Sequence, residues 1–519
     1  MSKYLDNRFL TLFFFPFLIG SLSTLSFQPF NLTFVNFLIL PIFFYLIVYI
    51  NKKSKSVYRK KPYKKNLFYF GTAFGFGFYL SGIHWITNAL TFDENFKILI
   101  PFGLILIPLF LSLFFSLTTL LVGPLLNLNF QSIIFFSASL AISDYLRGKI
   151  LTGFPWNFWA YSFSWSAEII QILSKIGLFA FNLISITLFM LPAVLFLNLN
   201  FTKKIYHILV LLMILFFLYI YGNYSLNSGQ KKLKTYKETV NVKVISPNFD
   251  LEYGLEYKDI ENRLKKLIKY SDPINNTKTI FIWPEGVFSG YSYNEILTLK
   301  NIFQNNFSKN HFILFGINRI DKKKKGFYNS LVIIDNKMEI IQEYKKQKLV
   351  PFGEFLPLEN LLSKIGLKKI TEGHGSFLKG GKQKNLKVEK MNILPLICYE
   401  IIFTKFVQLS NKDTNLIINI SEDGWFGNSI GPYQHFAKSI FRSVEHNSFL
   451  LRSANKGISA IINNKGQVVK KLNPSEAGYI QQEVPLIKNK NRNKNDLIFF
   501  VLLFTYIFIF YLYKKNNDK

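Results

Sequence analysis

Cysteine is nearly absent from this sequence, because Cys398 is the only one among 519 residues. A single thiol excludes an internal disulfide and a metal site built from several cysteines. Acidic residues are also scarce, since 31 aspartates and glutamates stand against 62 lysines and arginines and give a formal net charge of +31. Such a charge suits nucleic acid or anionic lipid headgroups, and the hydrophobic pattern favours lipid. We therefore expect membrane lipid and no nucleic acid as a partner.

Charge is missing from several long stretches that are rich in phenylalanine, a residue that occurs 57 times. A run of about 20 apolar residues is typical of a membrane-spanning helix. We predict a bundle of eight spans, near residues 9–27, 33–50, 67–90, 97–122, 130–146, 167–198, 205–222 and 496–513. These spans divide the chain into a seven-span membrane domain at 1–222, a polar domain at 223–495, and a last helix with its tail at 496–519.

Basic residues predict the orientation of the spans, because lysine and arginine favour the cytoplasmic side of a membrane. The connection NKKSKSVYRKKPYKK at 51–65 is dense in both, whereas TNALTFDENFK at 87–97 is not. With the first connection inside and the second outside, seven spans carry residues 223–495 outside. The same assignment returns the basic tail KKNNDK to the cytoplasm.

Short β-branched runs alternate with polar helical patterns across residues 223–495. We predict a strand at Val240–Ser246 and an amphipathic helix at Lys258–Lys269. Further strands are expected at 279–283, 311–316, 329–334, 338–344, 392–398, 415–420 and 457–463. This alternation predicts an α/β domain.

Three of the predicted strands lead into a reactive side chain. TIFIWPEG delivers Glu285, EYKKQKLVPFGEF delivers Lys346 and then Glu354, and ILPLICYEIIF delivers Cys398. A cysteine attacks as a thiolate, and a neighbouring carboxylate can take its proton. A lysine ammonium can stabilise the thiolate and then the oxyanion of a tetrahedral intermediate. These residue types are together sufficient for acyl transfer without a metal or cofactor.

Each of these residues also has a plainer interpretation. A lone cysteine in an apolar strand is more often inert core, and Glu285 after Trp-Pro could be a solvated turn residue. Lys345 is the alternative to Lys346, because a one-residue slip in a strand turns the side chain to the opposite face. His84 and His435 have no second ligand at helical spacing, so we expect packing or hydrogen bonding there rather than a metal.

The motifs WPE, YKK before LVPFGE, and CYE resemble the three signature blocks of the nitrilase superfamily, also called carbon–nitrogen hydrolases. With the membrane spans, the chain resembles the bacterial apolipoprotein N-acyltransferase family. Further stretches resemble blocks of that family: GIHW at 82–85, DYLRGKILTGFPWN at 144–157, NISEDGWFG at 419–427, QHFAKSIFRSVE at 434–445 and LLRSANKGISA at 450–460. The resemblance implies a nitrilase-like α-β-β-α sandwich set on the eight-span bundle.

The resemblance also implies roles for individual residues. Glu285 would be the general base, Lys346 the oxyanion-stabilising cation and Cys398 the nucleophile. Supporting residues would be Glu354, Tyr399 and Glu400, and substrate-binding residues would be Trp425, Phe426 and Trp156. The sequence departs from the family pattern at Lys348, where a histidine is usual. It also departs at Glu422 and Gly424, because SEDGWFG stands here where SNDAWFG is usual.

By the same resemblance, the protein would transfer a fatty acyl chain from a membrane phospholipid to the α-amine of the diacylglyceryl-modified N-terminal cysteine of an apolipoprotein. It would act through a thioester on Cys398, without a cofactor and as a monomer. It would lie in the bacterial inner membrane with the catalytic domain on the periplasmic face. The alternatives are a membrane-anchored amidase that uses water as acceptor and, outside enzymes, a transporter, against which the spans carry few interior charges.

Overall fold

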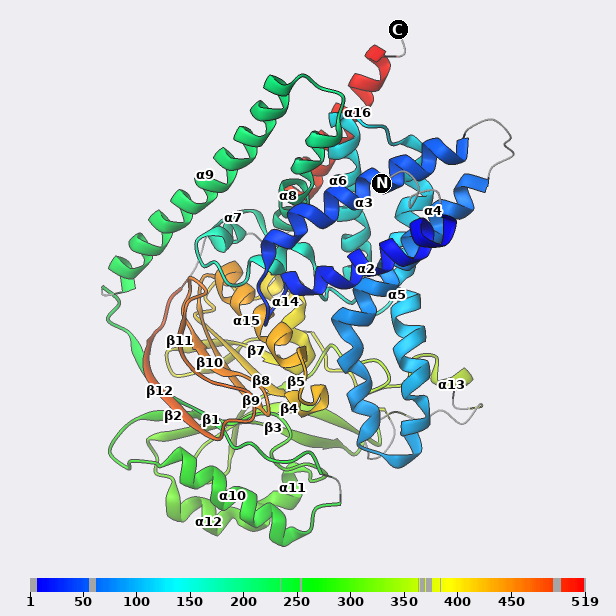
Figure 1. The fold of residues 1–519 in the computed structure, drawn as a ribbon. Helices are drawn as coiled ribbons and strands as arrows, with labels where there is room; N and C mark the ends of the chain where they lie inside the picture. Colours follow the sequence, from blue (N-terminus) through cyan, green and yellow to red (C-terminus); the bar gives the residue numbers. More distant parts are fainter. Residues whose placement is uncertain are drawn as a thin grey trace. The chain divides into compact units, whose positions relative to one another are not determined.

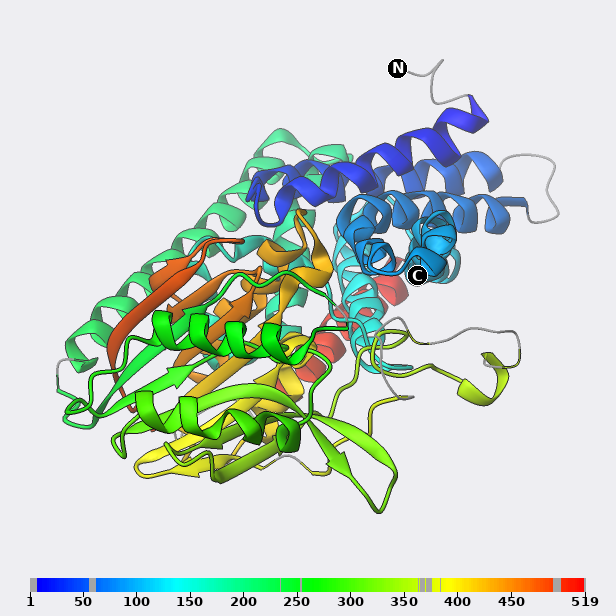
Figure 2. The same ribbon diagram turned by 90° about the horizontal axis from the view of Figure 1, so that it is seen from below.

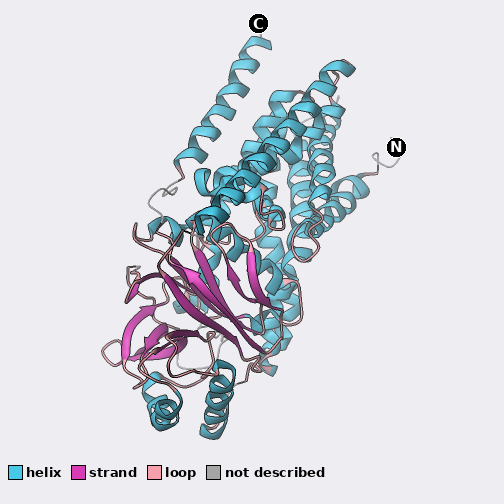
Figure 3. Cartoon of the chain, turned by 90° about the vertical axis from the view of Figure 1, so that its left-hand side faces the viewer, coloured by secondary structure: helices cyan, strands magenta, loops and turns pink. Residues whose placement is uncertain are grey.

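The chain forms two compact units. The computed structural model describes residues 7–517 apart from 56–61, 234, 253, 363, 365–368, 370–375, 383 and 489–495. Unit 1 comprises Met1–Thr87, Ile98–Ser225 and Asn495–Lys519, and unit 2 comprises Asn88–Lys97 and Leu226–Lys494. Strands gather in unit 2 (Figure 3). Part of the basic connection at 51–65 lies outside the described residues, so its cytoplasmic location stays a prediction.

Apolar helices build unit 1. Their bounds are Phe15–Leu22 (α2), Asn36–Lys55 (α3), Pro62–Ile83 (α4), Ile100–Val122 (α5), Phe130–Lys149 (α6), Leu173–Ile176 (α7), Leu178–Met190 (α8), Phe201–Leu233 (α9) and Leu497–Asn517 (α16). Within the described residues, four helical stretches are long and apolar enough to cross a membrane: Thr33–Lys53, Glu94–Leu125, Leu178–Phe196 and Phe201–Lys231. Leu10–Ser26 and Leu497–Leu512 are shorter apolar helices. The total of eight spans stays a prediction.

The predicted span at 167–198 is not one continuous helix. A 3-10 turn at Ile169–Ile172 leads into α7, and α8 starts only after Gly177. Gly177 has a φ of 78°, a left-handed conformation that ends α7 and that glycine adopts without steric cost. Apolar composition alone carries no sign of this break.

Helices α4 and α5 pack closely through small residues, as membrane helices commonly do. A Cβ added to Gly75 would lie 2.8 Å from the Ser112 Cα. Polar side chains also join the two helices, because the Thr72 and Ser116 hydroxyls are hydrogen-bonded at 2.8 Å. The pair therefore combines close backbone approach with hydrogen bonds that remain satisfied in an apolar medium.

Two six-stranded sheets form the centre of unit 2. The strands are Thr239–Ser246 (β1), Thr279–Ile282 (β2), His311–Asp321 (β3), Gly326–Ile334 (β4), Ile340–Lys345 (β5), Leu386–Val388 (β6), Met391–Ile397 (β7), Leu416–Glu422 (β8), Phe449–Asn455 (β9), Ser459–Ile462 (β10), Val468–Leu472 (β11) and Gly478–Pro485 (β12). One sheet has the order β12-β1-β2-β3-β4-β5 and the other β11-β10-β9-β8-β7-β6. Strands β1, β2 and β3 run parallel, as do β7, β8 and β9.

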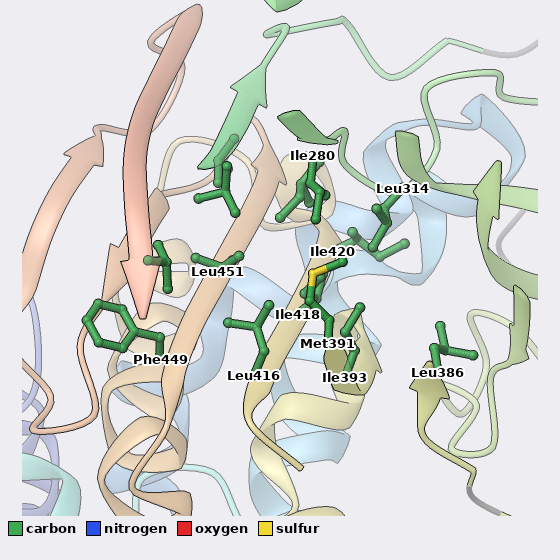
Figure 4. Packing of buried hydrophobic residues seen from close by; sticks show 14 of the residues in the cluster. Ile280, Leu314, Leu386, Met391, Ile393, Leu416, Ile418, Ile420, Phe449 and Leu451 are labelled. Carbon is green, nitrogen blue, oxygen red and sulfur yellow. The ribbon is translucent and has the colours of Figure 1, made fainter. Parts of the chain in front are cut away.

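The inner faces of the two sheets meet in one apolar core. Ile280 and Leu314 of the first sheet and Ile393 and Ile418 of the second belong to the same buried cluster (Figure 4). Full burial of such side chains stabilises a fold by about 1.5–3 kcal/mol each. Because both sheets contribute, this core fixes the sheets face to face.

Helices cover the outer faces of both sheets. Helices α10 (Tyr257–Ser271) and α12 (Lys300–Asn306) lie side by side on the first sheet (Figures 1 and 2). Leu264 and Phe303 of these helices pack with Phe281 of β2 in a second core. On the second sheet, α15 (Gly431–His446) packs against β9 and β10. The predicted α-β-β-α sandwich is therefore confirmed.

Candidate active site

Three strand ends carry the side chains that the sequence predicts to be reactive. Lys346 follows β5 directly, Cys398 follows β7 directly, and Glu285 lies three residues after β2. Close packing on β3 holds the Glu285 backbone, because a Cβ added to Gly316 would lie 2.9 Å from the Glu285 Cα. The carboxyl ends of strands and the loops after them are common positions for chemistry in α/β folds.

Lys346 lies between two carboxylates. Its Nζ is 2.9 Å from Glu354 Oε1 and 3.3 Å from Glu285 Oε1. The side chain is only 1% exposed. Lys345 instead places its Nζ over the Tyr328 ring, 4.1 Å from the centroid. Lys346, and not Lys345, is therefore the lysine that meets the carboxylates.

Asn329 is part of the same site, although it is not among the residues predicted from the sequence. Its Nδ2 donates to Glu285 Oε1 at 2.7 Å and to Glu354 Oε1 at 2.9 Å. Its backbone carbonyl accepts from the Lys346 N–H at 2.9 Å. Asn329 lies in β4, beside β5, and the sequence shows it only as a polar residue in a predicted strand.

Charges inside this cluster control the pKa of Lys346. Burial lowers the pKa of the Lys346 ammonium, but the Glu285 and Glu354 carboxylates more than offset that effect, so the pKa lies above its ordinary value. The lysine is therefore a permanent cation. Removing either carboxylate partner from such a buried charge typically costs about 3–5 kcal/mol.

Cys398 occupies a sharp bend between β7 and a 3-10 helix at Cys398–Ile402. Its φ is 47°, in the left-handed region that side chains other than glycine rarely adopt. Burial raises the pKa of the thiol, and the Glu285 charge raises it further, whereas Lys346 and a hydrogen bond to Ser421 lower it. The net effect is a raised pKa, so the resting sulfur is a thiol that needs a base.

Glu400 joins the segment after Lys346 to the segment after Cys398. Its Oε1 accepts from Tyr344 Oη at 2.9 Å and from the Gln347 and Lys348 N–H groups at 2.7 and 3.1 Å. Its Oε2 accepts from the Ile397 N–H at 2.9 Å. Burial raises the pKa of Glu400 to about 7, although the backbone donors act against this rise. Next to it, the Tyr399 ring packs edge-on against Phe403 with centroids 5.1 Å apart.

The end of β8 contacts both the base and the thiol. The Glu422 N–H donates to Glu285 Oε2 at 3.1 Å, and Ser421 hydrogen-bonds the Cys398 thiol. The Ser421 hydroxyl donates its one hydrogen to Asp423 Oδ1 at 2.6 Å, and the same hydrogen can turn to the sulfur when the thiolate forms. Burial raises the pKa of Glu422 to about 8, although hydrogen bonds from Gly424 and Asn455 oppose the shift. These contacts give β8 a place in the site that the sequence analysis did not assign.

Asp423, two residues after Ser421, is hydrogen-bonded by an arginine and a histidine side chain. Arg452 Nη2 donates to its Oδ2 at 2.7 Å, and His435 Nδ1 lies 3.0 Å from its Oδ1. Although burial alone would raise the pKa of Asp423, Arg452 and His435 hold it below its ordinary value. The predicted hydrogen-bonding interpretation of His435 is confirmed.

The three predicted substrate-binding residues lie in different surroundings. Trp425 and Phe426 belong to a 3-10 helix at Asp423–Phe426 in unit 2. Asn88 Nδ2 donates to the Phe426 carbonyl at 2.6 Å, and Phe92 packs edge-on to Trp425 with centroids 5.2 Å apart. Trp156 is buried within unit 1 against Trp85, with centroids 4.9 Å apart. Substrate contact by these tryptophans and by Phe426 stays a prediction.

Comparison with known families fixes the class of protein. The carbon-nitrogen hydrolase family model matches residues 252–488, which include Glu285, Lys346 and Cys398. Unit 2 thus carries a carbon–nitrogen hydrolase domain. A second model, the apolipoprotein N-acyltransferase N-terminal domain, matches residues 19–191.

Curated relatives match nearly the whole chain. The chain is 32% identical to an apolipoprotein N-acyltransferase of Rhodopseudomonas palustris, with 90% of this chain and 88% of the relative covered. It is 33% and 34% identical to those of Rickettsia typhi and Rickettsia prowazekii, with 90% of this chain and 91% of each relative covered. Among solved structures, Nit3 of Saccharomyces cerevisiae, of the nitrilase superfamily, aligns over 48% of this chain and 91% of that chain at 15% identity and a TM-score of 0.36. The chain belongs to the apolipoprotein N-acyltransferase family.

Proposed function

We propose that this protein transfers a fatty acyl chain from a membrane phospholipid to the α-amine of the diacylglyceryl-modified N-terminal cysteine of apolipoproteins. The observation that carries the proposal is the buried Lys346, which is held between Glu285 and Glu354. The same domain contains Cys398, the single thiol of the chain. Membership of the family supports the acyltransferase activity, and the apolar helices of unit 1 suit lipid substrates.

In the first half-reaction, Cys398 is acylated. Glu285 takes the thiol proton, and the sulfur attacks the carbonyl carbon of the phospholipid ester. The Lys346 ammonium stabilises the oxyanion that forms. As the intermediate collapses, the ester C–O bond breaks and Glu285 returns the proton to the leaving alkoxide. The products are a thioester on Cys398 and a lysophospholipid.

In the second half-reaction, the α-amine of the apolipoprotein takes the acyl chain. The amine attacks the thioester carbon, Glu285 takes a proton from the amine nitrogen, and the C–S bond breaks. The thiolate then regains the proton from Glu285, leaving an amide on the product. The ester supplies the activated acyl group, so neither half-reaction requires a nucleotide or a metal.

The two carboxylates beside Lys346 have separate tasks in this scheme. Glu285 alternates between its charged and neutral forms, which removes a counter-charge from Lys346 in mid-cycle. Glu354, at 2.9 Å from the ammonium, remains as a constant counter-charge. Its Oε2 also accepts from the Val350 N–H at 2.9 Å, which keeps it in place. Tyr399 and Glu400 support the segment that carries the thiol.

The membrane arrangement belongs to the same proposal. We place seven spans in residues 1–222 and an eighth in 496–519. Residues 223–495 form the catalytic domain, which lies on the periplasmic face of the inner membrane. Trp425, Phe426 and Trp156 contribute to substrate binding, and the protein acts as a monomer. Acyl-CoA and ATP are absent on that face, and the reaction does not need them because the phospholipid ester is itself the activated acyl donor.

A mass-spectrometric experiment tests the function. Purified protein is incubated with a phospholipid of defined acyl chains, and its intact mass is expected to rise by one acyl group that neutral hydroxylamine removes. Cys398→Ala should show no increase. Adding a diacylglyceryl-modified peptide should discharge the adduct and yield an N-acylated peptide. Release of free fatty acid without acylated peptide would favour the amidase alternative.

A further inference from the structure

Lys348 lies beside the site without a role in the scheme above. It follows Lys346 by two residues, and its backbone N–H donates to Glu400 at 3.1 Å. Its half-buried side chain places Nζ 4.9 Å from the centroid of Phe403. Phe403 in turn packs against Tyr399, the residue next to the thiol. The Lys348 ammonium is thus positioned by both segments that Glu400 joins.

Two further lysines lie in segments that neighbour the Lys348 segment. Lys379 precedes Gly380, whose N–H donates to the Lys346 carbonyl at 2.8 Å. Lys405 lies in α14 (Thr404–Leu409), which begins directly after Phe403. Both side chains are exposed. Burial lowers the pKa of Lys348, and the charges of Lys379 and Lys405 lower it further.

This lysine cluster, Lys348 with Lys379 and Lys405, concentrates positive charge next to the segments that carry Lys346 and Cys398. Like charges destabilise one another, most of all where one ammonium is partly desolvated. An anion with several acceptor oxygens would relieve the repulsion and take hydrogen bonds from more than one ammonium. Lysine binds phosphate as a compact point charge in this way.

We infer that the lysine cluster binds the phosphodiester of the phospholipid acyl donor. This inference rests on the proposed function and deepens it by naming the group that the site recognises. In a glycerophospholipid, one glycerol unit separates the phosphate from the reactive ester. A phosphate held at Lys348 therefore keeps the ester near the segments that carry Lys346 and Cys398.

The inference restricts the lysine cluster to one half of the reaction. The diacylglyceryl group of the acceptor has no phosphate, so the cluster contributes to acylation of Cys398 and not to its discharge. The rate of acylation from an ester donor without phosphate should also be unaffected by replacement of Lys348. These two consequences separate phosphate recognition from a general loss of structure.

The experiment measures acylation of Cys398 in wild type, Lys348→Gln and Lys348→Arg, with Lys412→Gln as a matched loss of one exposed lysine charge. Intact mass is unambiguous, because the chain has one cysteine. Each protein receives either phosphatidylglycerol or p-nitrophenyl palmitate, which carries an activated ester and no phosphate. For Lys348→Gln we expect about tenfold slower acylation from phosphatidylglycerol, in line with loss of one charge-assisted hydrogen bond.

The same variant should react with p-nitrophenyl palmitate at the wild-type rate. Lys348→Arg should retain most of the phospholipid rate, and Lys412→Gln should match wild type with both donors. Inorganic phosphate should slow wild-type acylation from phosphatidylglycerol but not acylation from the phosphate-free ester. Equal losses with both donors, or no loss with phosphatidylglycerol, would overturn the inference while leaving the acyltransferase proposal intact. Failure of wild type to accept phosphatidylglycerol while p-nitrophenyl palmitate still reacts would overturn the inference alone, and failure with both donors would overturn the acyltransferase proposal as well.

Discussion

At the scale of single residues, the site brings several acidic side chains together and gives each of them hydrogen-bond donors. Glu285 and Glu354 share one cation, Lys346, and Asn329 donates both hydrogens of its amide to the same two carboxylates. Asp423 has its own cation in Arg452. Two neighbouring residues at the end of β8, Ser421 and Glu422, make measurable predictions.

Ser421 predicts a change in thiol reactivity. Its hydroxyl can donate to the Cys398 thiolate, and this hydrogen bond lowers the pKa of the thiol, so Ser421→Ala is expected to move the midpoint of alkylation to higher pH. Iodoacetamide uptake against pH measures this directly, since Cys398 is the only cysteine. Ser453→Ala is the matched control, because that buried hydroxyl donates to the Ile245 carbonyl at 2.7 Å instead. An unchanged midpoint in Ser421→Ala would contradict the role.

Glu422 predicts a pH dependence of stability. Burial raises its pKa from 4.5 to about 8, so between these values the folded state holds a proton that the unfolded chain releases. The free energy of unfolding therefore falls as pH rises through this window. Between pH 5 and pH 9 wild type should lose about 4 kcal/mol of unfolding free energy through this residue, and Glu422→Gln should lack that loss.

Denaturant unfolding at several pH values tests this. The raised pKa of Glu400, about 7, also makes the free energy of unfolding fall as pH rises. This residue is present in wild type and in Glu422→Gln, so some pH dependence should remain in both proteins. Parallel curves for wild type and Glu422→Gln would refute the assignment.

At the scale of elements, the segment Asn88–Lys97 belongs to unit 2 although the chain on either side belongs to unit 1. Asn88 and Phe92 attach it to the 3-10 helix at Asp423–Phe426, which continues directly from β8. Support for the base and the thiol at the end of β8 therefore depends partly on a segment remote in sequence.

Phe92→Ala should loosen that helix. Edge-on aromatic contacts contribute about 0.5–1.5 kcal/mol beyond area burial, so amide exchange across residues 423–427 should become about 3- to 10-fold faster. Acyl transfer should slow to a similar extent. Asn95→Ala removes an exposed side chain that hydrogen-bonds Asp93 within the same segment at 3.0 Å, and it should leave both rates unchanged.

Much of the second unit could be predicted from local pattern, because β1, β2, β4, β7 and β8 lie within apolar or β-branched runs. Strand β9 was missed, since FLLRSAN carries Arg452 and two further polar side chains that are buried only because Asp423, Asn419 and other partners meet them. Strand β12 was missed because only Ile480 and Val484 of its eight residues are buried, so it carries little apolar signal. Glu285, Lys346 and Cys398 were found through their motifs, whereas Asn329 and Ser421 depend on contacts between strands.

At the scale of the whole molecule, the single cysteine makes membrane orientation testable. In a Cys398→Ala background, Glu94→Cys and Lys412→Cys should react with a membrane-impermeant maleimide added to cells with a permeable outer membrane. Lys52→Cys should react only after the inner membrane is broken. All three positions are exposed. Labelling of Lys52→Cys in intact cells would contradict the proposed topology.

The left-handed backbone at Cys398 has a consequence for how inactive forms of the protein behave. Its φ of 47° is one that a β-carbon disfavours and that glycine tolerates, a difference of about 1 kcal/mol. Cys398→Gly should therefore melt at a higher temperature than Cys398→Ala, although both lack the thiol. Equal melting temperatures would mean that the bend stores no strain. Cysteine at this position lowers conformational stability and supplies the reactive thiol. Cys398→Gly is therefore the more stable inactive variant in which to trap bound substrates.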